Sequence, residues 1–305
     1  MSEASLGWTP ASEWDLSRVS ALKGTHRIAV VIPARNEQKT IESVVRIITS
    51  NLGDLVDDVI VMDSLSSDAT AAIAADAGAQ VHSVADVRPD LGVHAGKGEA
   101  LWKSLFVTDA DVLVFIDADL TDWGPHFVTG LVGPLLADPR VMLVRGFYDR
   151  VLNVGSSPSL EGGRVTELVA RPWLALHRPE LAGVIQPLAG EWAIRRSAFE
   201  QLSVPMGYGV ELSTLLDVHD RFGLESIAQV DLGRRAHRHQ SLHDLSAMAL
   251  ELMVVAERRG REGGSPQGRM THPGEMVTLR LPTVDRSWKV REVPTGERPP
   301  HVDVQ

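Results

Sequence analysis

Short apolar segments alternate with helical segments through residues 26–120 of this 305-residue chain. The strand-length apolar segments are Ile28–Ile32, Val59–Met62, Gln80–Val84 and Val112–Ile116. Between them, apolar residues recur at helical spacing in Thr40–Thr49, Ala69–Ala77 and Glu99–Val107. Strands that alternate with helices in this way are typical of βαβ units. Such units form a mostly parallel sheet with helices on both faces, so the pattern predicts an α/β fold.

The alternation loosens after residue 120, and we expect four parts in the chain. Residues 1–25 are interpreted as an N-terminal leader, and 26–120 as a nucleotide-binding half. A more irregular half, 121–260, has the room for a second ligand. Residues 261–305 are rich in Gly, Pro and charged residues, so we expect a C-terminal extension that is partly disordered or lies at a dimer interface. The elements expected in the second half are helices at Phe127–Leu136, Val165–Leu176, Leu212–Phe222 and Leu242–Arg259, and strands at Val141–Tyr148, Glu191–Arg195 and Ile227–Leu232.

Composition narrows the classes of protein. The net charge is −10, whereas a general nucleic-acid binder is normally basic, so we expect no nucleic-acid partner. The chain has no cysteine, which excludes disulfides, thiolate metal sites and cysteine nucleophiles and fits a cytoplasmic location. The apolar runs are of strand length, far short of the roughly 20 residues of a membrane span. We therefore expect neither a signal peptide nor a membrane span.

A pair of carboxylates follows the strand Val112–Ile116. Asp117 and Asp119 are separated by one residue, and residues i and i+2 of an extended chain point the same way. At the carboxyl end of a parallel strand, both side chains would converge on the crevice where α/β proteins bind ligands. Hard oxygen ligands suit Mg²⁺ or Mn²⁺ on a diphosphate. The pattern alone also fits a polar strand exit with a helix cap.

Other polar segments follow strands or open helices. Pro33–Glu37 and Ser64 follow the first two strands, where they fit either a ligand crevice or ordinary turns. Gly96-Lys97-Gly98 precedes a helix and fits a phosphate site, although it is not a Walker A loop, and it equally fits a plain helix start.

Two segments of the second half are candidates for anion binding. Gly163, Arg164 and Thr166 open a helix, where free N–H groups, a guanidinium and a hydroxyl favour an anion, although a helix cap beside a surface arginine explains them equally well. The basic run 234–239, which contains Arg235, His237 and His239, follows the last predicted strand. In an acidic chain such a run indicates an anionic ligand, with zinc or RNA binding as alternatives.

These motifs, in this order, resemble the actinobacterial glucosyl-3-phosphoglycerate synthases, which are retaining sugar-nucleotide transferases of the GT-A fold. The resemblance covers roughly residues 26–245, and the stretch Arg164–Pro172 is its most specific part. It implies transfer of glucose from UDP-glucose to the 2-hydroxyl of 3-phosphoglycerate with retention and with Mg²⁺, which Mn²⁺ or Co²⁺ would replace. It also implies a homodimer and a place at the first step of glucosylglycerate or methylglucose lipopolysaccharide synthesis. Residues 26–120 would be the nucleotide-sugar-binding half and 121–260 the acceptor-binding half.

The resemblance also implies a role for each matching residue. The donor would be held by the following residues: Pro33, Ala34, Glu37, Ser64, Lys97, Asp117, Asp119, Tyr208 and Glu211. The acceptor-binding residues would be Gly163, Arg164, Thr166, Arg235 and His239. Asp119 and His237 would bind the metal, and the segment containing Leu188 would be the wall beside the reacting centre. Asp119, Glu211 and Leu188 are thus the expected catalytic set.

Two positions depart from the family pattern. Leu65 stands where relatives usually have Gly, in a turn for which a positive φ favours Gly. His239 stands where relatives have Asn, which bears on acceptor preference. The alternatives that remain are a GDP-mannose-dependent mannosyl-3-phosphoglycerate synthase, a polyprenyl-phosphate transferase, and a non-catalytic sugar-nucleotide sensor.

Overall fold

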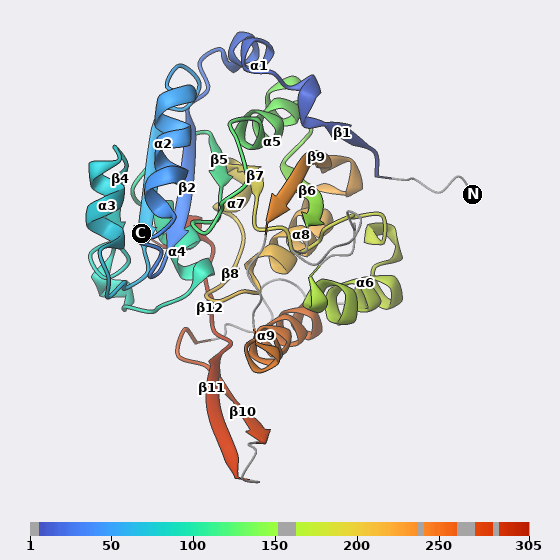
Figure 1. Cartoon of the computed structure of the whole chain (residues 1–305). Coiled ribbons are helices and arrows are strands. Elements are labelled where there is room, and N and C mark those ends of the chain that lie inside the picture. The colour runs from blue at the N-terminus through green and yellow to red at the C-terminus, as the bar shows by residue number, and fades with distance from the viewer. Residues whose placement is uncertain (1–5, 152–162, 237–240, 261–271, 283–286, 305) are drawn as a thin grey trace.

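The computed structural model describes residues 6–151, 163–236, 241–260, 272–282 and 287–304. Its centre is an eight-stranded sheet in the order β1-β9-β6-β7-β5-β2-β3-β4 (Figure 1). All pairs are parallel except those of β7, which runs antiparallel to β5 and β6. The strands are β1 Trp8–Pro10, β2 Ile28–Ala34, β3 Asp58–Asp63, β4 Gln80–Ser83, β5 Val112–Phe115, β6 Leu143–Val151, β7 Trp192–Arg195 and β9 Ile227–Ala236. The predicted mostly parallel α/β sheet is confirmed.

Helices cover both faces of the sheet because its central strands are apolar on both sides. In β2, Val30 and Ile32 join one hydrophobic cluster, whereas Ala29 and Val31 join the other. The first cluster is covered by α1 Leu16–Lys23, α2 Ile41–Asn51, α3 Thr70–Asp76 and α5 His126–Ala137. The second is covered by α4 Lys97–Ser104, α6 Arg171–His177, α7 Arg196–Phe199, α8 Val210–Phe222 and α9 Leu242–Gly260.

Shorter elements complete the chain. A π-helix, Thr166–Ala170, precedes α6 where one continuous amphipathic helix was expected. The 3₁₀ turns are Ala11–Glu13, Pro89–Leu91, Pro179–Leu181, Leu224–Ser226 and His301–Asp303. None of the helices within the described ranges is long and apolar enough to cross a bilayer.

The described part of the segment interpreted as an N-terminal leader, residues 6–25, belongs to the fold. Its strand β1 extends the sheet by pairing in parallel with β9, and its expected helix is α1. Trp14 is buried against Gly133 of α5, where a Cβ atom would lie 2.3 Å from the indole ring. The strand was not predicted because three residues ending in Pro carry no alternation pattern.

The described part of the C-terminal extension forms ordered elements. The antiparallel hairpin β10 Met276–Pro282 and β11 Trp288–Pro294 projects from the body beyond α9 (Figure 1). After it, β12 Glu297–Arg298 pairs with β8 Val204–Pro205, and Arg298 is buried. Residues 261–271 lie outside the described ranges. The expectation of partial disorder overlooked Arg298, because its buried partner, Glu99, lies far away in the sequence.

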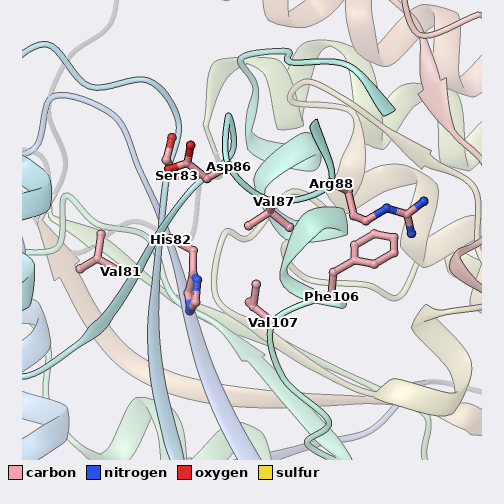
Figure 2. Close-up of a pocket in the computed structure, with 8 residues that line it drawn as sticks. All are labelled: Val81, His82, Ser83, Asp86, Val87, Arg88, Phe106 and Val107. Atoms are coloured by element: carbon pink, nitrogen blue, oxygen red, sulfur yellow. The ribbon is translucent and has the colours of Figure 1, made fainter. Parts of the chain in front are cut away.

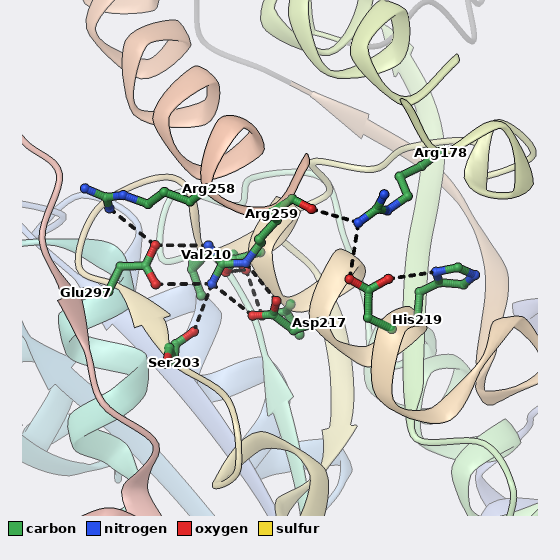
Figure 3. Close-up of polar contacts among 11 residues, drawn as sticks. Arg178, Ser203, Val210, Asp217, His219, Arg258, Arg259 and Glu297 are labelled. Carbon is green, nitrogen blue, oxygen red and sulfur yellow. Dashed lines mark hydrogen bonds and ion pairs between the residues drawn. The ribbon is translucent and has the colours of Figure 1, made fainter. Parts of the chain in front are cut away.

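A cluster of ion pairs joins this extension to the helices of the second face (Figure 3). Arg259, at the end of α9, binds Asp217 of α8 through two hydrogen bonds of 2.8 and 2.9 Å. The same guanidinium binds Glu297 of β12 at 3.0 and 3.2 Å. Burial lowers the pKa of Arg259, but the two carboxylates outweigh it and raise the pKa above its usual value. The cluster therefore fixes α8, α9 and β12 relative to one another.

Candidate active site

The Asp-x-Asp motif lies at the carboxyl end of β5, as predicted. Asp117 and Asp119 are half-buried, and Ala118 between them is buried. Gly190 lies against Asp117, because a Cβ atom at Gly190 would be 2.1 Å from Asp117 Oδ2. Leu188 belongs to the same segment, so the structure brings this predicted wall against the first aspartate.

Lys97 joins the motif to a second carboxylate. Its Nζ lies 2.6 Å from Asp117 Oδ1 and 2.7 Å from Glu211 Oε1. Burial alone would lower the pKa of Lys97. The negative charges of Asp117 and Glu211 together have the larger effect, so the pKa lies above its usual value. This shift favours the ammonium form of Lys97, and three predicted donor-binding residues form one ion-pair cluster.

The two glycines beside Lys97 allow this placement. A Cβ atom at Gly96 would lie 2.1 Å from the backbone oxygen of Met206, and one at Gly98 would lie 1.7 Å from that of Pro205. Only glycine lets α4 begin so close to the neighbouring backbone. Close packing therefore explains the two glycines of Gly96-Lys97-Gly98, in addition to the phosphate site that the sequence suggested.

Glu211 lies in the first turn of α8, and a residue of β6 fixes the position of its backbone. Arg145, fully buried on β6, donates a hydrogen bond from Nη2 to the backbone oxygen of Glu211. Burial lowers the pKa of Arg145 to about 10, against the attraction of Glu211. The Nε and Nη1 atoms of Arg145 are buried and have no hydrogen-bond partner among the described residues.

Tyr208 precedes α8 and is 48% exposed. Its pKa is raised, mainly by burial of its hydroxyl; the charge of Lys97 opposes this shift, and nearby carboxylates including Glu251 support it. Its backbone N donates to the carboxylate of Glu251 on α9 at 2.6 Å. Tyr208 thus stands beside the Lys97 cluster, as expected for a donor-binding residue.

The ends of β2 and β3 bring the remaining donor candidates together. Ser64 N donates to the oxygen of Ala34 at 2.8 Å, and Ser64 Oγ accepts from Gly96 N at 3.1 Å. Pro33 is on β2, and Glu37 N donates to Thr70 Oγ1 at 2.8 Å. The hydroxyl of Ser64 therefore connects the strand ends to the loop that carries Lys97.

The departure at Leu65 leaves the turn in its positive-φ conformation. Leu65 has φ of 61° and is partly exposed, and Asn36, in the neighbouring turn after β2, has φ of 59°. A hydrogen bond links the two turns, because the side-chain oxygen Oδ1 of Asn36 accepts from the backbone N of Ser67 at 2.8 Å. The loop keeps the left-handed conformation that favours glycine although Leu occupies it.

The acceptor candidates begin with Gly163, Arg164 and Thr166. Arg164 is exposed, and Thr166 is buried at the start of the π-helix. Glu167 N donates to the oxygen of Gly163 at 3.0 Å, which closes the first turn. π-Helical turns are rare and occur frequently at functional sites, which agrees with the role predicted for this segment.

The basic run begins on a strand rather than after it. Arg234 and Arg235 lie on β9, which is longer than the predicted Ile227–Leu232, and they pair with residues 149 and 150 of β6. The side chain of Arg235 and the residues His237 and His239 lie outside the described part of the chain. Among the described residues, no three His, Asp or Glu side chains form a metal-binding group. The predicted pairing of Asp119 with His237 therefore stays a prediction.

A cavity lies away from these residues. It measures about 430 Å³, lies between β4 and the end of α4, and has walls that include His82, Arg88 and Phe106 (Figure 2). None of the predicted site residues lines it. A cavity of about 170 Å³ does adjoin the site, lined by Tyr208, Asp244, Met248, Glu251 and Arg291.

Comparison with known proteins decides the family. The model of glycosyl transferase family 2 matches residues 29–203. The chain belongs to glycosyl transferase family 2. Within the family, this glycosyltransferase is 48% identical over 246 residues to the glucosyl-3-phosphoglycerate synthase of Mycobacterium tuberculosis. The aligned region covers 79% of this chain and 76% of that protein. The corresponding synthase of Petrotoga mobilis is 41% identical over 282 residues, 91% of this chain and 87% of that one.

The fold of this glycosyltransferase agrees with the same relatives. The crystal structure of the M. tuberculosis synthase in complex with Mn²⁺, UDP-glucose and phosphoglyceric acid superimposes with a TM-score of 0.85 at 41% identity. The match covers 98% of this chain and 99% of that one. The resemblance seen in the sequence is confirmed.

Two residues of the glycosyltransferase site were not predicted. Arg145 and Glu251 position Glu211 and Tyr208, respectively. Both leave a trace in the sequence. Arg145 is the single charged residue of the predicted apolar strand Val141–Tyr148, and Glu251 stands between Leu250 and Leu252 in an apolar stretch of the predicted helix Leu242–Arg259. Charged residues are almost never buried unless paired, so each of these two indicates a distant partner.

Proposed function

We propose that this glycosyltransferase transfers glucose from UDP-glucose to the 2-hydroxyl of 3-phosphoglycerate with retention, giving glucosyl-3-phosphoglycerate. The observation that carries the proposal is the likeness, over nearly the full chain, to a synthase crystallised with Mn²⁺, UDP-glucose and phosphoglyceric acid. The Lys97–Asp117–Glu211 cluster supports it, since the matching donor-binding residues lie in mutual contact.

The charge of the site supports a divalent cation. Lys97 is one ammonium among three carboxylates, those of Asp117, Asp119 and Glu211, so this side of the crevice would repel a diphosphate. A hard cation held by carboxylate oxygens reverses that sign. Asp117 is bound by Lys97, so we assign the metal to Asp119, with His237 as its second ligand by resemblance. Mg²⁺ is the expected ion, with Mn²⁺ or Co²⁺ as substitutes, and when bound it supplies positive charge to the leaving diphosphate.

The acceptor would bind at the π-helix. Its phosphate and carboxylate carry negative charge, which the guanidinium of Arg164 and the N–H groups of the first turn would attract. Thr166 contributes a hydroxyl, and Arg235 and His239 complete the set by resemblance.

For the transfer itself we propose attack on the same face from which UDP leaves. A bond forms between the acceptor's 2-oxygen and the anomeric carbon while the bond to the β-phosphate oxygen breaks. The hydroxyl proton goes to the leaving phosphate. Glu211 is held by Lys97, so we assign it to orienting the sugar rather than to nucleophilic attack. Leu188 would close the wall beside the reacting centre.

The test is turnover of 3-phosphoglycerate by the purified protein with UDP-glucose, GDP-glucose and GDP-mannose in parallel, each with Mg²⁺ and with a chelator. We expect UDP-glucose to be used and the chelator to stop turnover. Preference for GDP-mannose would make the protein a mannosyl-3-phosphoglycerate synthase, and binding without turnover would make it a sensor. NMR of the product tests retention through the anomeric coupling constant.

We further infer a homodimer and a cytoplasmic location. Support for the dimer comes from exposed apolar side chains on α9 and the projecting hairpin, namely Met253, Met276, Trp288 and Val290. Other apolar residues of α9, among them Leu245, Met248, Leu252 and Ala256, pack on the same chain. A light-scattering mass of one chain, 33.1 kDa, at micromolar concentration would exclude the dimer.

A further inference from the structure

The turn that carries Tyr208 is held between two helices. On one side, Met206 O accepts from Glu99 N at 2.9 Å and Gly207 O accepts from Gly98 N at 3.2 Å, both in the first turn of α4. On the other side, Tyr208 N donates to Glu251 Oε2 of α9 at 2.6 Å. The turn 206–209 thus has its two carbonyl oxygens fixed by α4 and its N–H group fixed by α9.

The contact with α9 is too close for any side chain to intervene. A Cβ atom at Gly207 would lie 1.9 Å from Glu251 Oε2, and one at Gly209 would lie 2.6 Å from Cγ2 of Val255. Both glycines therefore bring the turn directly against the helix. Glu251 is nearly buried there, although it is a charged residue on an otherwise largely apolar face.

The turn leads into the reacting part of the site. α8 begins at Val210, so Glu211 follows the turn immediately, and its carboxylate binds Lys97 from α4. A shift of the turn would move Tyr208 and Glu211 together. The position of these two residues relative to Lys97 therefore depends on what holds the turn.

We propose that Glu251 is a positioning residue of the transfer reaction: its ionised carboxylate fixes the turn 206–209 and so places Tyr208 and Glu211 against the donor. The role rests on the proposed function. A charge-assisted hydrogen bond is about twice as strong as a neutral one, so protonation of Glu251 weakens the hold without removing it.

The surroundings of Glu251 place this protonation near neutrality. Burial raises the pKa of Glu251 to about 7; the hydrogen bond from Tyr208 and the charge of Arg291 oppose the shift, and Glu211 supports it. The charged and titratable groups facing it are Tyr208 from the turn, Glu211 from α8, Asp244 from α9 and Arg291 from β11. Asp244 binds Arg291 at 3.0 Å and does not contact the turn.

The same shift has a consequence for stability. The folded protein binds this proton more tightly than the unfolded chain, whose Glu has a pKa near 4.5. The folding free energy contributed by this protonated carboxyl is therefore lost as the pH rises from about 4.5 to about 7, and no more is lost above that. If Glu251 positions the turn, its replacement should lower activity and raise stability. If it served stability alone, its replacement would lower stability.

The experiment compares E251Q with the parent protein from pH 5.5 to 8.5. Gln keeps the acceptor oxygen but not the charge. We expect the ratio of kcat/KM for UDP-glucose, E251Q over parent, to be near one at pH 5.5 and to fall roughly three- to tenfold by pH 8.5. The melting temperature of E251Q should exceed that of the parent, and the excess should be larger at pH 8.5 than at pH 5.5, because it grows between about pH 4.5 and 7 and is constant above.

Other titrating groups, including His237, are present in both E251Q and the parent, so their effects cancel in the ratio of the two kcat/KM values. The matched control is D244N, which loses a carboxylate from the same cavity and should give a ratio that is flat with pH. E251A removes the acceptor and should lose more activity than E251Q at every pH. A ratio for E251Q that is flat with pH overturns the proposal, whatever its value.

A second readout separates this proposal from the proposed function. Calorimetric titration with UDP and Mn²⁺ needs no turnover, and the affinity of E251Q relative to the parent should fall over the same pH range. If the parent turns over no donor, the proposed function fails and the UDP ratio alone decides the role of Glu251. An unchanged UDP ratio together with a flat kcat/KM ratio would make Glu251 a packing residue.

Discussion

Arg298 binds Glu99 through two parallel hydrogen bonds of 2.6 Å each, across 199 positions of the chain. Both side chains are buried, and Nη1 of the same guanidinium donates to the oxygen of Leu91 at 2.7 Å. Glu99 lies in the first turn of α4, two residues after Lys97. The C-terminal extension thus holds the helix that carries the site's ammonium group.

Removal of one member of this pair should destabilise the protein strongly. R298A leaves Glu99 buried, with Lys103 at 3.5 Å as its remaining cationic partner in the described part of the chain, and breaking a buried pair costs about 3–5 kcal/mol of unfolding free energy. Urea unfolding checks this value. The double variant R298M/E99M should recover part of the loss, since an apolar pair of similar volume replaces a paired charge at little cost. Equal losses in the single and double variants would contradict the importance of the pairing.

Loss of Lys97 should abolish efficient use of the donor. K97M leaves Asp117 and Glu211 without their shared cation, so their charges repel each other and the diphosphate. We expect kcat/KM for UDP-glucose to fall at least a hundredfold, roughly 3 kcal/mol. Steady-state kinetics with the control K23M, on α1, make the comparison; an effect of similar size in both would point to unfolding.

Arg164 should act on the acceptor alone. R164A removes a charge-assisted bond of about 1.5–3 kcal/mol, so the KM for 3-phosphoglycerate should rise roughly ten- to a hundredfold. UDP-glucose affinity should stay nearly unchanged. R46A, which removes an exposed arginine paired with Glu42 on α2, is the matched control. An unchanged acceptor KM would remove Arg164 from the site.

The metal assignment is tested by binding rather than by turnover. In the parent, Mn²⁺ should strengthen UDP binding, and in H237A it should do so much less. D119N should lose both the metal effect and turnover. Because a ligating imidazole is unprotonated, the metal effect in the parent should also weaken as the pH falls towards the imidazole pKa. Equal strengthening in H237A and the parent would show that His237 is not a ligand.

Leu65 should be replaceable by Gly with a gain in stability. A left-handed conformation costs a non-glycine residue about 1–2 kcal/mol. Gly avoids this cost but loses more backbone entropy on folding, which offsets roughly 0.5–1 kcal/mol of the gain. L65G should therefore raise the unfolding free energy by up to about 1 kcal/mol. L65A keeps the Cβ atom and should bring no gain, and thermal melting of the three proteins decides.

The sequence predicted those parts of the fold whose signal is local. The strands and helices of residues 26–120 follow from apolar periodicity, and Asp117 and Ser64 were placed because ligands gather at the carboxyl ends of parallel strands. β1 was missed because it is an edge strand of three residues that ends in Pro.

The missed site residues have partners far away in the sequence. Arg145 contacts a backbone oxygen 66 positions away, and Glu251 contacts an N–H group 43 positions away. No periodicity records such a pairing. Arg298 was missed for the same reason, since its segment has the composition of a loose tail while its guanidinium occupies a buried site made by Glu99 and Leu91.

The distance between Glu99 and Arg298 along the chain also sets an order of events during biosynthesis. Chains are synthesised at about 5–20 residues per second, so Glu99 precedes its partner by roughly 10–40 seconds. Through that interval α4 has its glycine-lined start but not the guanidinium that anchors it. Glu99 therefore meets its buried partner only after residues 121–260 and most of the C-terminal extension have been translated, and a chain that ends before Arg298 lacks the guanidinium that anchors α4.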